Sequence, residues 1–142
     1  MFLGEYEYKV DSKGRLPLPP KFRQELGTGL ILTRGEETCI VAYPLAEWHK
    51  LAEQLATRTV TPSKLRRLNR VIFGAADPLT LDGQGRVALP SRLRRYAQIG
   101  DIATIVGVNN RIELWNPDLW NSERVSAEEQ VWQIIESLED QQ

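Results

Sequence analysis

Two short motifs of the chain combine a carboxylate, a glycine and an arginine at the same spacing. They are Asp11-Ser-Lys-Gly-Arg15 and Asp82-Gly-Gln-Gly-Arg86, and each is followed within four residues by Leu-Pro. Asp and Gly at this spacing are typical of a tight turn, because Asp accepts hydrogen bonds from nearby backbone and Gly tolerates a positive φ. An arginine beside such a turn can hold a carboxylate, a phosphate or a guanine edge through two parallel hydrogen bonds. The motifs therefore predict two hairpin turns that present Arg15 and Arg86.

The role of these two arginines stays open at this point. In one interpretation the turns enter or straddle a groove of duplex DNA, and the arginines contact guanine or phosphate while Gly14 and Gly85 allow a close backbone approach. In the other, Asp11 and Asp82 form ion pairs with the arginines and brace the turns. Both interpretations can hold together, because they can use different atoms of the same guanidinium group.

Further cations surround the motifs. Lys13 and Gln84 occupy the same position in the two turns, and lysine suits a phosphate whereas glutamine can pair with adenine. Both could equally be solvent-facing tip residues. Because the tips differ, the two halves are expected to contact DNA unequally. The short helices that should follow begin with basic residues, which are either phosphate contacts or a solvated helix face: Lys21, Arg23, Arg92 and Arg94.

The residues that most enzymes and metal sites require are sparse. The chain has one histidine, His49, and one cysteine, Cys39, and no phosphate-loop or metal-ligand spacing. A hydrolase or transferase would have little to build an active site from. We therefore expect no enzymatic activity, no cofactor, no metal and no small-molecule substrate. Cys39, in an apolar run, is expected to be buried, and His49 to lie on the surface.

The charge of the chain is polarised although its net value is −1. Residues 58–95 hold nine basic and two acidic side chains, whereas residues 96–142 hold two basic and nine acidic ones. Such polarity fits a protein with one face toward phosphate and another toward solvent or a basic partner. For the stretch Lys64–Arg70 alone, the solvated face of a helix explains the charge equally well.

Nothing in the sequence indicates a membrane protein. No apolar run approaches the roughly 20 residues of a transmembrane helix, and Met1–Glu7 lacks the basic region of a signal peptide. With a single cysteine, the sequence favours a reducing, cytoplasmic setting.

The two motifs belong to a longer internal repeat. Val10–Pro19 reappears as Leu81–Pro90 at an offset of 71, and Trp48 lines up with Trp120 at an offset of 72, which suggests one inserted residue. In the first copy the pattern predicts strands at 6–10, 15–18, 30–33 and 38–42 and a helix at 21–26. We expect repeats at 5–48 and 77–120, a helical connector at 49–76 and a C-terminal helix at 121–142.

The C-terminal helix is expected to be amphipathic and acidic. Ser126–Glu129 is a capping-box pattern that would start it, and Val131, Ile135 and Leu138 form an apolar stripe that Trp132 and Ile134 widen. The four tryptophans, which could stack on bases, are assigned instead to the core or to a subunit interface.

The motifs make the chain resemble the MraZ family. The resemblance rests on the Met-Phe-x-Gly start, the two Asp-x-x-Gly-Arg turns with Leu-Pro, the pair Arg34-Gly, the Gly107 turn and Trp115-Asn-Pro, and it covers nearly the whole chain. It implies an α+β, mainly β fold in which two tandem SpoVT-AbrB modules exchange hairpins in a double-split β-barrel. Helices would lie between and after the modules.

The resemblance also implies a function. Members of the family are sequence-specific DNA-binding regulators of the division and cell-wall gene cluster, which bind short direct repeats of double-stranded DNA as ring-shaped homo-oligomers at the nucleoid. It places DNA contact at Lys13, Arg15, Gln84 and Arg86. The alternative is an antitoxin-like protein of the same fold that acts by binding a protein partner. An extended tail would favour that alternative, whereas this C-terminus reads as a helix.

Overall fold

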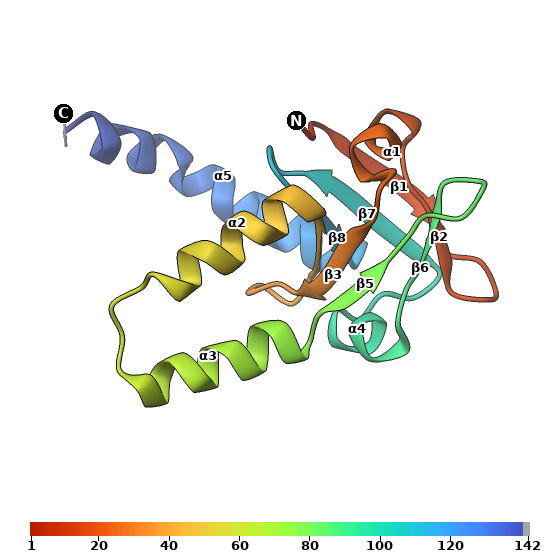
Figure 1. The fold of residues 1–142 in the computed structure, drawn as a ribbon. Coiled ribbons are helices and arrows are strands. Elements are labelled where there is room, and N and C mark those ends of the chain that lie inside the picture. Colours follow the sequence, from red (N-terminus) through yellow and green to blue (C-terminus); the bar gives the residue numbers. More distant parts are fainter. Residues whose placement is uncertain (141–142) are drawn as a thin grey trace.

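A six-stranded antiparallel sheet and a separate two-stranded ribbon form the framework of the computed structural model, which describes residues 1–140 (Figure 1). The sheet has the strand order β1-β7-β8-β4-β3-β5, and the ribbon pairs β2 with β6. The fold is therefore of the mixed α+β class. The strands are β1 (Glu5–Lys9), β2 (Arg15–Pro17), β3 (Leu30–Arg34), β4 (Ile40–Pro44), β5 (Asp77–Leu79), β6 (Arg86–Ala88), β7 (Ile102–Gly107) and β8 (Ile112–Trp115).

The two repeats exchange strands. The first strand of repeat 1, β1, pairs with β7 of repeat 2, and the first strand of repeat 2, β5, pairs with β3 of repeat 1. The remaining inter-repeat pairs, β4 with β8 and β2 with β6, join equivalent strands. Neither repeat can therefore complete its strand pairing alone. Within residues 1–140, β1 and β5 form the two edges of the sheet and do not pair with each other, so closure into a barrel stays a prediction.

Strand pairing also corrects the alignment of the repeats. Val41 of β4 pairs directly with Glu113 of β8, so these two equivalent strands are related by an offset of 72. The strand before each is paired in the same way, because Thr33 pairs with Val41 in repeat 1 and Val106 pairs with Glu113 in repeat 2. Thr33 is therefore equivalent to Val106, and β3 and β7 are related by an offset of 73. The expected single insertion is thus wrong. Relative to repeat 1, repeat 2 has gained two residues before β7 and lost one in the turn before β8.

Five helices surround the strands in the described part of the chain. They are α1 (Pro20–Leu26), α2 (Leu45–Ala56), α3 (Pro62–Gly74), α4 (Ser91–Tyr96) and α5 (Pro117–Glu139). The expectation that α5 starts at Ser126 is wrong. The side chain of Asn116 accepts hydrogen bonds from the backbone N–H of Asp118 and Leu119, and Pro117 occupies the first helical position. This asparagine cap followed by proline starts the helix before the capping-box pattern of Ser126–Glu129, which lies inside α5. The last two residues of the expected segment 121–142 lie outside the described residues.

The ribbon is fixed to the protein through its inner face. Leu16 of β2 and Val87 of β6 face each other across the ribbon and are fully buried. They join one core cluster with Phe22 of α1 and Leu93 of α4. Because the strands alternate their side chains between two faces, residues beside Leu16 and Val87 must point outward. This core therefore decides which side chains the ribbon presents to solvent.

The two predicted turns lie together at one end of the molecule. Figure 1 shows the loops before β2 and β6 on the right, and α2, α3 and the far end of α5 on the left. Two of the tryptophans, Trp48 and Trp115, are buried, whereas Trp132 of α5 is 71% exposed. The molecule thus has a turn-bearing end and a helical end.

Candidate nucleic-acid interface

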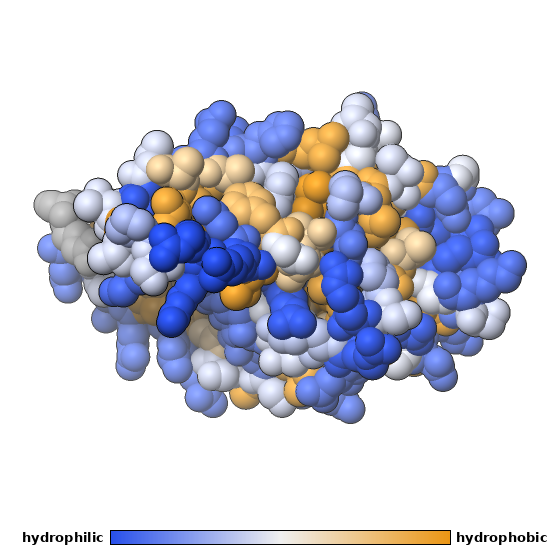
Figure 2. All heavy atoms as spheres, turned by 60° about the horizontal axis from the view of Figure 1, so that its bottom comes forward, coloured by the Kyte–Doolittle hydropathy of each residue, from blue (hydrophilic) through white to orange (hydrophobic). Residues whose placement is uncertain are grey.

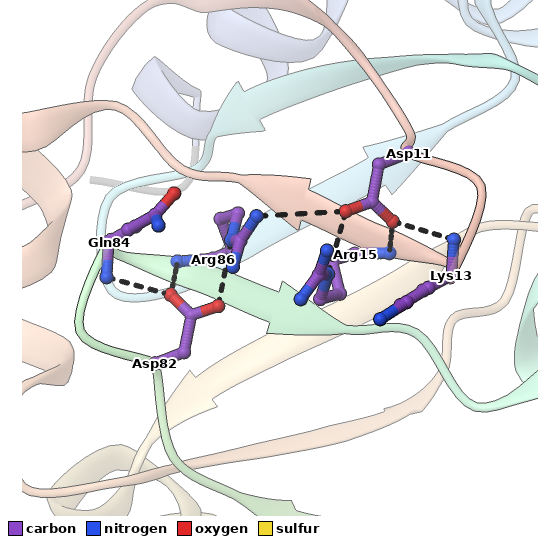
Figure 3. A network of polar contacts seen from close by, with 6 residues as sticks. All are labelled: Asp11, Lys13, Arg15, Asp82, Gln84 and Arg86. Carbon is purple, nitrogen blue, oxygen red and sulfur yellow. Dashed lines mark hydrogen bonds and ion pairs between the residues drawn. The ribbon is translucent and has the colours of Figure 1, made fainter.

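The two Asp-x-x-Gly-Arg motifs form turns of nearly the same geometry (Figure 3). In turn 1 (residues 11–14), Oδ1 of Asp11 accepts hydrogen bonds from the backbone N–H of Lys13 and of Arg15, both at 2.9 Å. Its Oδ2 accepts a hydrogen bond from Nε of Arg15 at 2.6 Å. A single carboxylate therefore ties together the turn backbone and the arginine side chain.

Turn 2 (residues 82–85) repeats this arrangement in the second copy. Oδ1 of Asp82 accepts hydrogen bonds from the backbone N–H of Gln84 at 2.9 Å and of Arg86 at 3.0 Å, and Oδ2 accepts one from Nε of Arg86 at 2.7 Å. Gly14 and Gly85 close the turns with φ of 77° and 74°. An L side chain rarely adopts this backbone conformation, which accounts for the repeated glycine.

The hydrogen bonds keep both carboxylates ionised. The backbone N–H of Arg15, the Arg15 side chain and the backbone N–H of Lys13 lower the pKa of Asp11 from 3.8 to about 2. The equivalent hydrogen bond from the backbone of Arg86 is the largest cause that lowers the pKa of Asp82. A negative charge is thus held beside each guanidinium group, which restricts the directions in which the arginines can point.

The ribbon brings both arginines to one outward face. Arg15 pairs with Ala88 and Pro17 pairs with Arg86, so the two guanidinium groups leave the same face at diagonal positions. The turns lie at opposite ends of this ribbon, as Figure 3 shows. In addition, Nη1 of Arg86 lies 3.7 Å from Oδ2 of Asp11, which links turn 2 to turn 1.

This arrangement can brace the turns and still bind an acceptor. The ion pairs with the aspartates use Nε of each arginine. Within residues 1–140, the two Nη atoms of Arg15 form no hydrogen bond. A guanidinium group held at Nε can present its two terminal nitrogens to a pair of acceptors, such as O6 and N7 of guanine or two phosphate oxygens. A two-stranded ribbon is also narrow enough to enter the major groove.

The tip residues of the turns are open to solvent. Lys13 and Gln84 are both exposed, and their backbone N–H groups are the ones bonded to the aspartates. Their side chains can therefore differ without disturbing the turn. The geometry makes the tip the variable position and the Asp-Gly-Arg frame the constant one.

The cations at the start of the short helices already have partners in the chain. Nζ of Lys21 lies 4.9 Å from the ring centroid of Tyr6, and Nη2 of Arg92 lies 2.7 Å from Oδ2 of Asp77. Nε of Arg23 donates a hydrogen bond to the carbonyl oxygen of Leu18 at 3.0 Å. Arg94 donates to the carbonyl oxygens of Ile99 and Gly100. Phosphate contact by these four residues stays a prediction.

Arg23 also packs closely against the turn of the opposite repeat, and Arg94 lies beside the other turn, an arrangement that sequence reasoning missed. A Cβ added at Gly85 would overlap Nε of Arg23 and lie 2.5 Å from its Cδ and Cζ. A Cβ added at Gly14 would lie 3.7 Å from Nη1 of Arg94. Backbone hydrogen bonds also join each turn to the other repeat. The carbonyl oxygen of Gly85 accepts from the N–H of Leu18, and that of Gly14 accepts from the N–H of Leu89. The signal was the matched position of the two arginines in the repeat.

The other candidate residues lie away from this end. The side chains of Lys64, Arg66, Arg67 and Arg70 are exposed on α3, which Figure 1 places on the opposite side of the molecule from the turns. His49 is exposed, and Cys39 is fully buried, as expected. Burial raises the pKa of the Cys39 thiol to about 12, so it is unsuited to act as a nucleophile.

Residues 1–140 lack the features of a membrane-spanning helix and of a metal site. No helix there is both long enough and apolar enough to span a membrane. No cluster of three or more His, Cys, Asp or Glu side chains in that range has the arrangement of a metal site.

A protein-family model and individual related proteins point to the same family for this chain. Residues 1–71 and 72–135 each match the model of the MraZ protein family, described as antitoxin-like. The Transcriptional regulator MraZ of Dehalococcoides mccartyi strain BAV1 is 54% identical over 141 residues, which cover 99% of both chains. The Transcriptional regulator MraZ of Halothermothrix orenii is 42% identical over 140 residues, or 99% of this chain and 98% of that one. That of Roseiflexus castenholzii is 41% identical over 122 residues, or 86% and 85% of the two chains.

Proposed function

The chain belongs to the MraZ family, and we propose that it is a transcriptional regulator that binds double-stranded DNA by sequence. The names of its relatives support regulation of transcription. One observation carries the proposal of DNA contact: two matched Asp–Arg turns lie on a single ribbon and direct two arginines to the same outward face. An enzyme would need no such duplication.

In the proposed mechanism the β2–β6 ribbon enters the major groove. Arg15 and Arg86 contact base edges through their terminal nitrogens while their Nε atoms stay bonded to the aspartates. Lys13 neutralises a phosphate at one tip, and Gln84 contacts an adenine or the backbone at the other. The pseudo-symmetry of the two turns matches the pseudo-symmetry of a duplex. Because the turns approach from opposite ends of the ribbon, each addresses a different part of the groove.

We further propose that copies of the chain assemble into a ring on successive direct repeats upstream of the division and cell-wall gene cluster. A single copy makes few base contacts, so its affinity for one repeat is low. Linking several copies makes each later binding event intramolecular and raises the overall affinity. The repeats should be spaced by about one helical turn, roughly 10 bp, so that each faces the ring. Such a protein would act in the cytoplasm, at the nucleoid.

The same proposal includes the architecture that the family implies. The strand exchange between repeats supports a double-split barrel with module boundaries near 5–48 and 77–120, because the first strand of each repeat pairs with a strand of the other. The connector at 49–76 and the helix at 121–142 would then lie outside the two modules.

A mobility-shift experiment tests DNA contact by the turns. The probe is a duplex that carries the direct repeats, with a scrambled duplex as competitor. Arg15→Ala and Arg86→Ala should each weaken specific binding by about 5- to 150-fold, because a bidentate base contact contributes about 1–3 kcal/mol. Arg58→Ala removes the same charge from the loop between α2 and α3, at the other end of the molecule, and should leave binding unchanged.

Loss of the ion pair with Asp11 or Asp82 could weaken binding by disturbing a turn. Arg15→Lys and Arg86→Lys separate the two effects, because lysine keeps the charge but cannot form the two parallel hydrogen bonds. They should retain binding to nonspecific DNA and lose preference for the repeats. If both alanine variants bind like the wild type in the same oligomeric state, the arginines only brace the turns. The basic residues of α3 would then become the leading candidates.

A further inference from the structure

The helical end of the molecule carries two charged surfaces that DNA contact at the turns does not use. One is the exposed side of α3, which carries Lys64, Arg66, Arg67 and Arg70 and no acidic residue. The other is the last part of α5, residues 125–140, here called the α5 tail, which carries Glu128, Glu129, Glu136, Glu139 and Asp140 and no basic residue. The two surfaces have opposite charge and belong to the same chain.

The α3 surface borders an apolar groove. No residue of α3 is fully buried, and Val71 is 62% exposed. Leu51 and Leu55 of α2, Leu68 and Val71 of α3 and Tyr43 of β4 line a cavity of about 670 Å³. Charged side chains line the same cavity, namely Arg34, Glu36, Glu37, Arg111 and Glu113. Figure 2, which brings this side of the molecule forward, shows hydrophobic side chains over its middle with hydrophilic side chains between them. A helix pair that leaves its shared groove open has an unpartnered apolar face.

The α5 tail carries a matching apolar stripe. Every residue from 125 to 140 is exposed. Val131, Ile134, Ile135 and Leu138 follow helical spacing and are 37–57% exposed, and Trp132 beside them is 71% exposed. A helix of this kind is normally stabilised by packing its apolar stripe on another surface. Residues 1–140 of the same chain do not cover it.

We propose that the α5 tail of one copy docks on the α2–α3 groove of a second copy. Trp132 enters the groove between the two helices, and the acidic side chains of the tail face the basic side chains of α3. The lengths agree, because the tail spans about 22 Å and α3 about 20 Å at 1.5 Å per residue. The charge match lies along α3 rather than in the cavity lining, where Glu36, Glu37 and Glu113 occur together with Arg34 and Arg111. The basic side chains of α3 beside the groove favour an acidic helix as its occupant. DNA would suit α3 but not the acidic tail, whereas a second copy satisfies both surfaces.

The contact joins two different surfaces and is therefore head-to-tail. After one contact forms, one copy still has a free groove and the other a free tail, so assembly continues until the chain of copies closes. The turns stay clear, since they lie at the opposite end of the molecule (Figure 1). This inference deepens the proposed function and rests on its self-association, because it names the two surfaces through which copies associate.

The experiment uses two full-length variants, each with one damaged surface. Lys64→Glu/Arg67→Glu reverses charge on α3, and Trp132→Glu removes the apolar anchor of the tail. Light scattering after gel filtration should show larger assemblies for the wild type and monomers for either variant alone. Mixed in equal amounts, the two variants should form a one-to-one dimer that grows no further. The first variant contributes the intact tail and the second the intact groove.

Matched controls separate this outcome from misfolding or a general charge effect. Arg58→Glu reverses a neighbouring charge in the loop outside α3 and should assemble like the wild type. All the substituted side chains are exposed, so circular dichroism and thermal unfolding should stay unchanged apart from the stability that assembly itself adds. High salt should weaken wild-type assembly, since exposed charges contribute to the contact.

Several results would overturn the inference. They are a monomeric wild type, assembly that survives either variant, or a mixture that stays monomeric although each variant is folded. Binding of DNA by wild type but not by the monomeric α3 variant, on a probe with a single repeat, would assign α3 to DNA instead. The failure of DNA binding in general would leave the assembly result standing, so this proposal and the DNA proposal can fail separately.

Discussion

The two turns share their frame and differ at the positions around it. In both, one aspartate binds two backbone N–H groups and the Nε of its arginine, with almost the same distances. The tips differ, with Lys13 in turn 1 and Gln84 in turn 2. The packing of the glycines differs too, because Arg23 lies tightly against turn 2 and Arg94 lies at ordinary contact distance from turn 1.

The pairs behind the turns repeat this contrast. Lys21 lies over the ring of Tyr6 in repeat 1, whereas Arg92 forms an ion pair with Asp77 at the equivalent positions of repeat 2. The frame that orients the arginines has therefore been kept after duplication, while the means of stabilising it and the group at the tip have diverged. A substitution at a tip can therefore change which DNA sequence the turn prefers without disturbing the Asp-Gly-Arg frame.

The largest expected difference between the turns concerns their glycines. Gly14→Ala should lower the free energy of unfolding by about 1–2 kcal/mol, the cost of a side chain at positive φ. Gly85→Ala should cost about 1 kcal/mol more. Its Cβ overlaps Arg23, which must move and give up its hydrogen bond to Leu18. Urea unfolding of the three proteins at the same protein concentration measures the difference.

Gly83→Ala is the matched control for these substitutions. Gly83 lies in turn 2, has no positive φ, and a Cβ there would meet nothing within 4 Å. It should change stability by less than about 0.5 kcal/mol. Equal losses for Gly14→Ala and Gly85→Ala would show that Arg23 does not constrain turn 2. A large loss for Gly83→Ala would show that the turn is generally intolerant.

A smaller effect should follow from exchanging the tips. Lys13→Gln should make the dependence of DNA affinity on salt less steep by about 0.9 in log–log slope, the value for one phosphate contact, and Gln84→Lys should make it steeper by the same amount. The double exchange should restore the total slope while moving the phosphate contact to the other end of the site. Fluorescence anisotropy over a salt series, with a duplex altered at one end at a time, reads both quantities. If neither substitution changes the salt dependence of DNA affinity, the side chains of Lys13 and Gln84 do not contact phosphate.

The sequence predicted the elements that local signals define. The turns follow from Asp and Gly at fixed spacing, and burial of Cys39 follows from its place in an apolar run. The repeat made the pairing of equivalent strands foreseeable. Helix boundaries were predicted less well where two start signals follow each other in the chain. The helix α5 begins at Pro117 after the Asn116 cap, and the capping-box pattern at Ser126 lies inside it.

The parts of the site that depend on exchange between repeats could not be read from the chain. The contact of Arg86 with Asp11 joins side chains far apart in sequence, and so does the packing of Arg23 on Gly85. Both depend on the register of β2 and β6, which no residue near them specifies. From their type alone, the basic residues of the short helices could be matched only to phosphate or to a solvated helix face, whereas their partners come from tertiary structure.

The smallest expected difference between the turns appears only in acid. Hydrogen bonds from the Arg15 backbone, from its side chain and from the Lys13 backbone lower the pKa of Asp11 to about 2. A carboxyl group with a lowered pKa in the folded state stabilises the protein fully above its ordinary pKa of 3.8. It loses that contribution as the pH falls toward about 2. Asp11→Asn should therefore flatten the fall in unfolding temperature between about pH 4 and pH 2.

Asp82→Asn provides the comparison for this acid effect. The pKa of Asp82 is lowered by the same kind of hydrogen bonds, chiefly from the backbone of Arg86. Asp11 has in addition Nη1 of Arg86 at 3.7 Å, so Asp11→Asn should flatten the acid dependence more than Asp82→Asn. Asparagine keeps an oxygen that can accept the backbone hydrogen bonds, so the turn itself should persist near neutral pH. If the two variants respond alike, the contact between Arg86 and turn 1 contributes nothing to the difference between the repeats, and the frame is symmetric in its electrostatics as well as in its geometry.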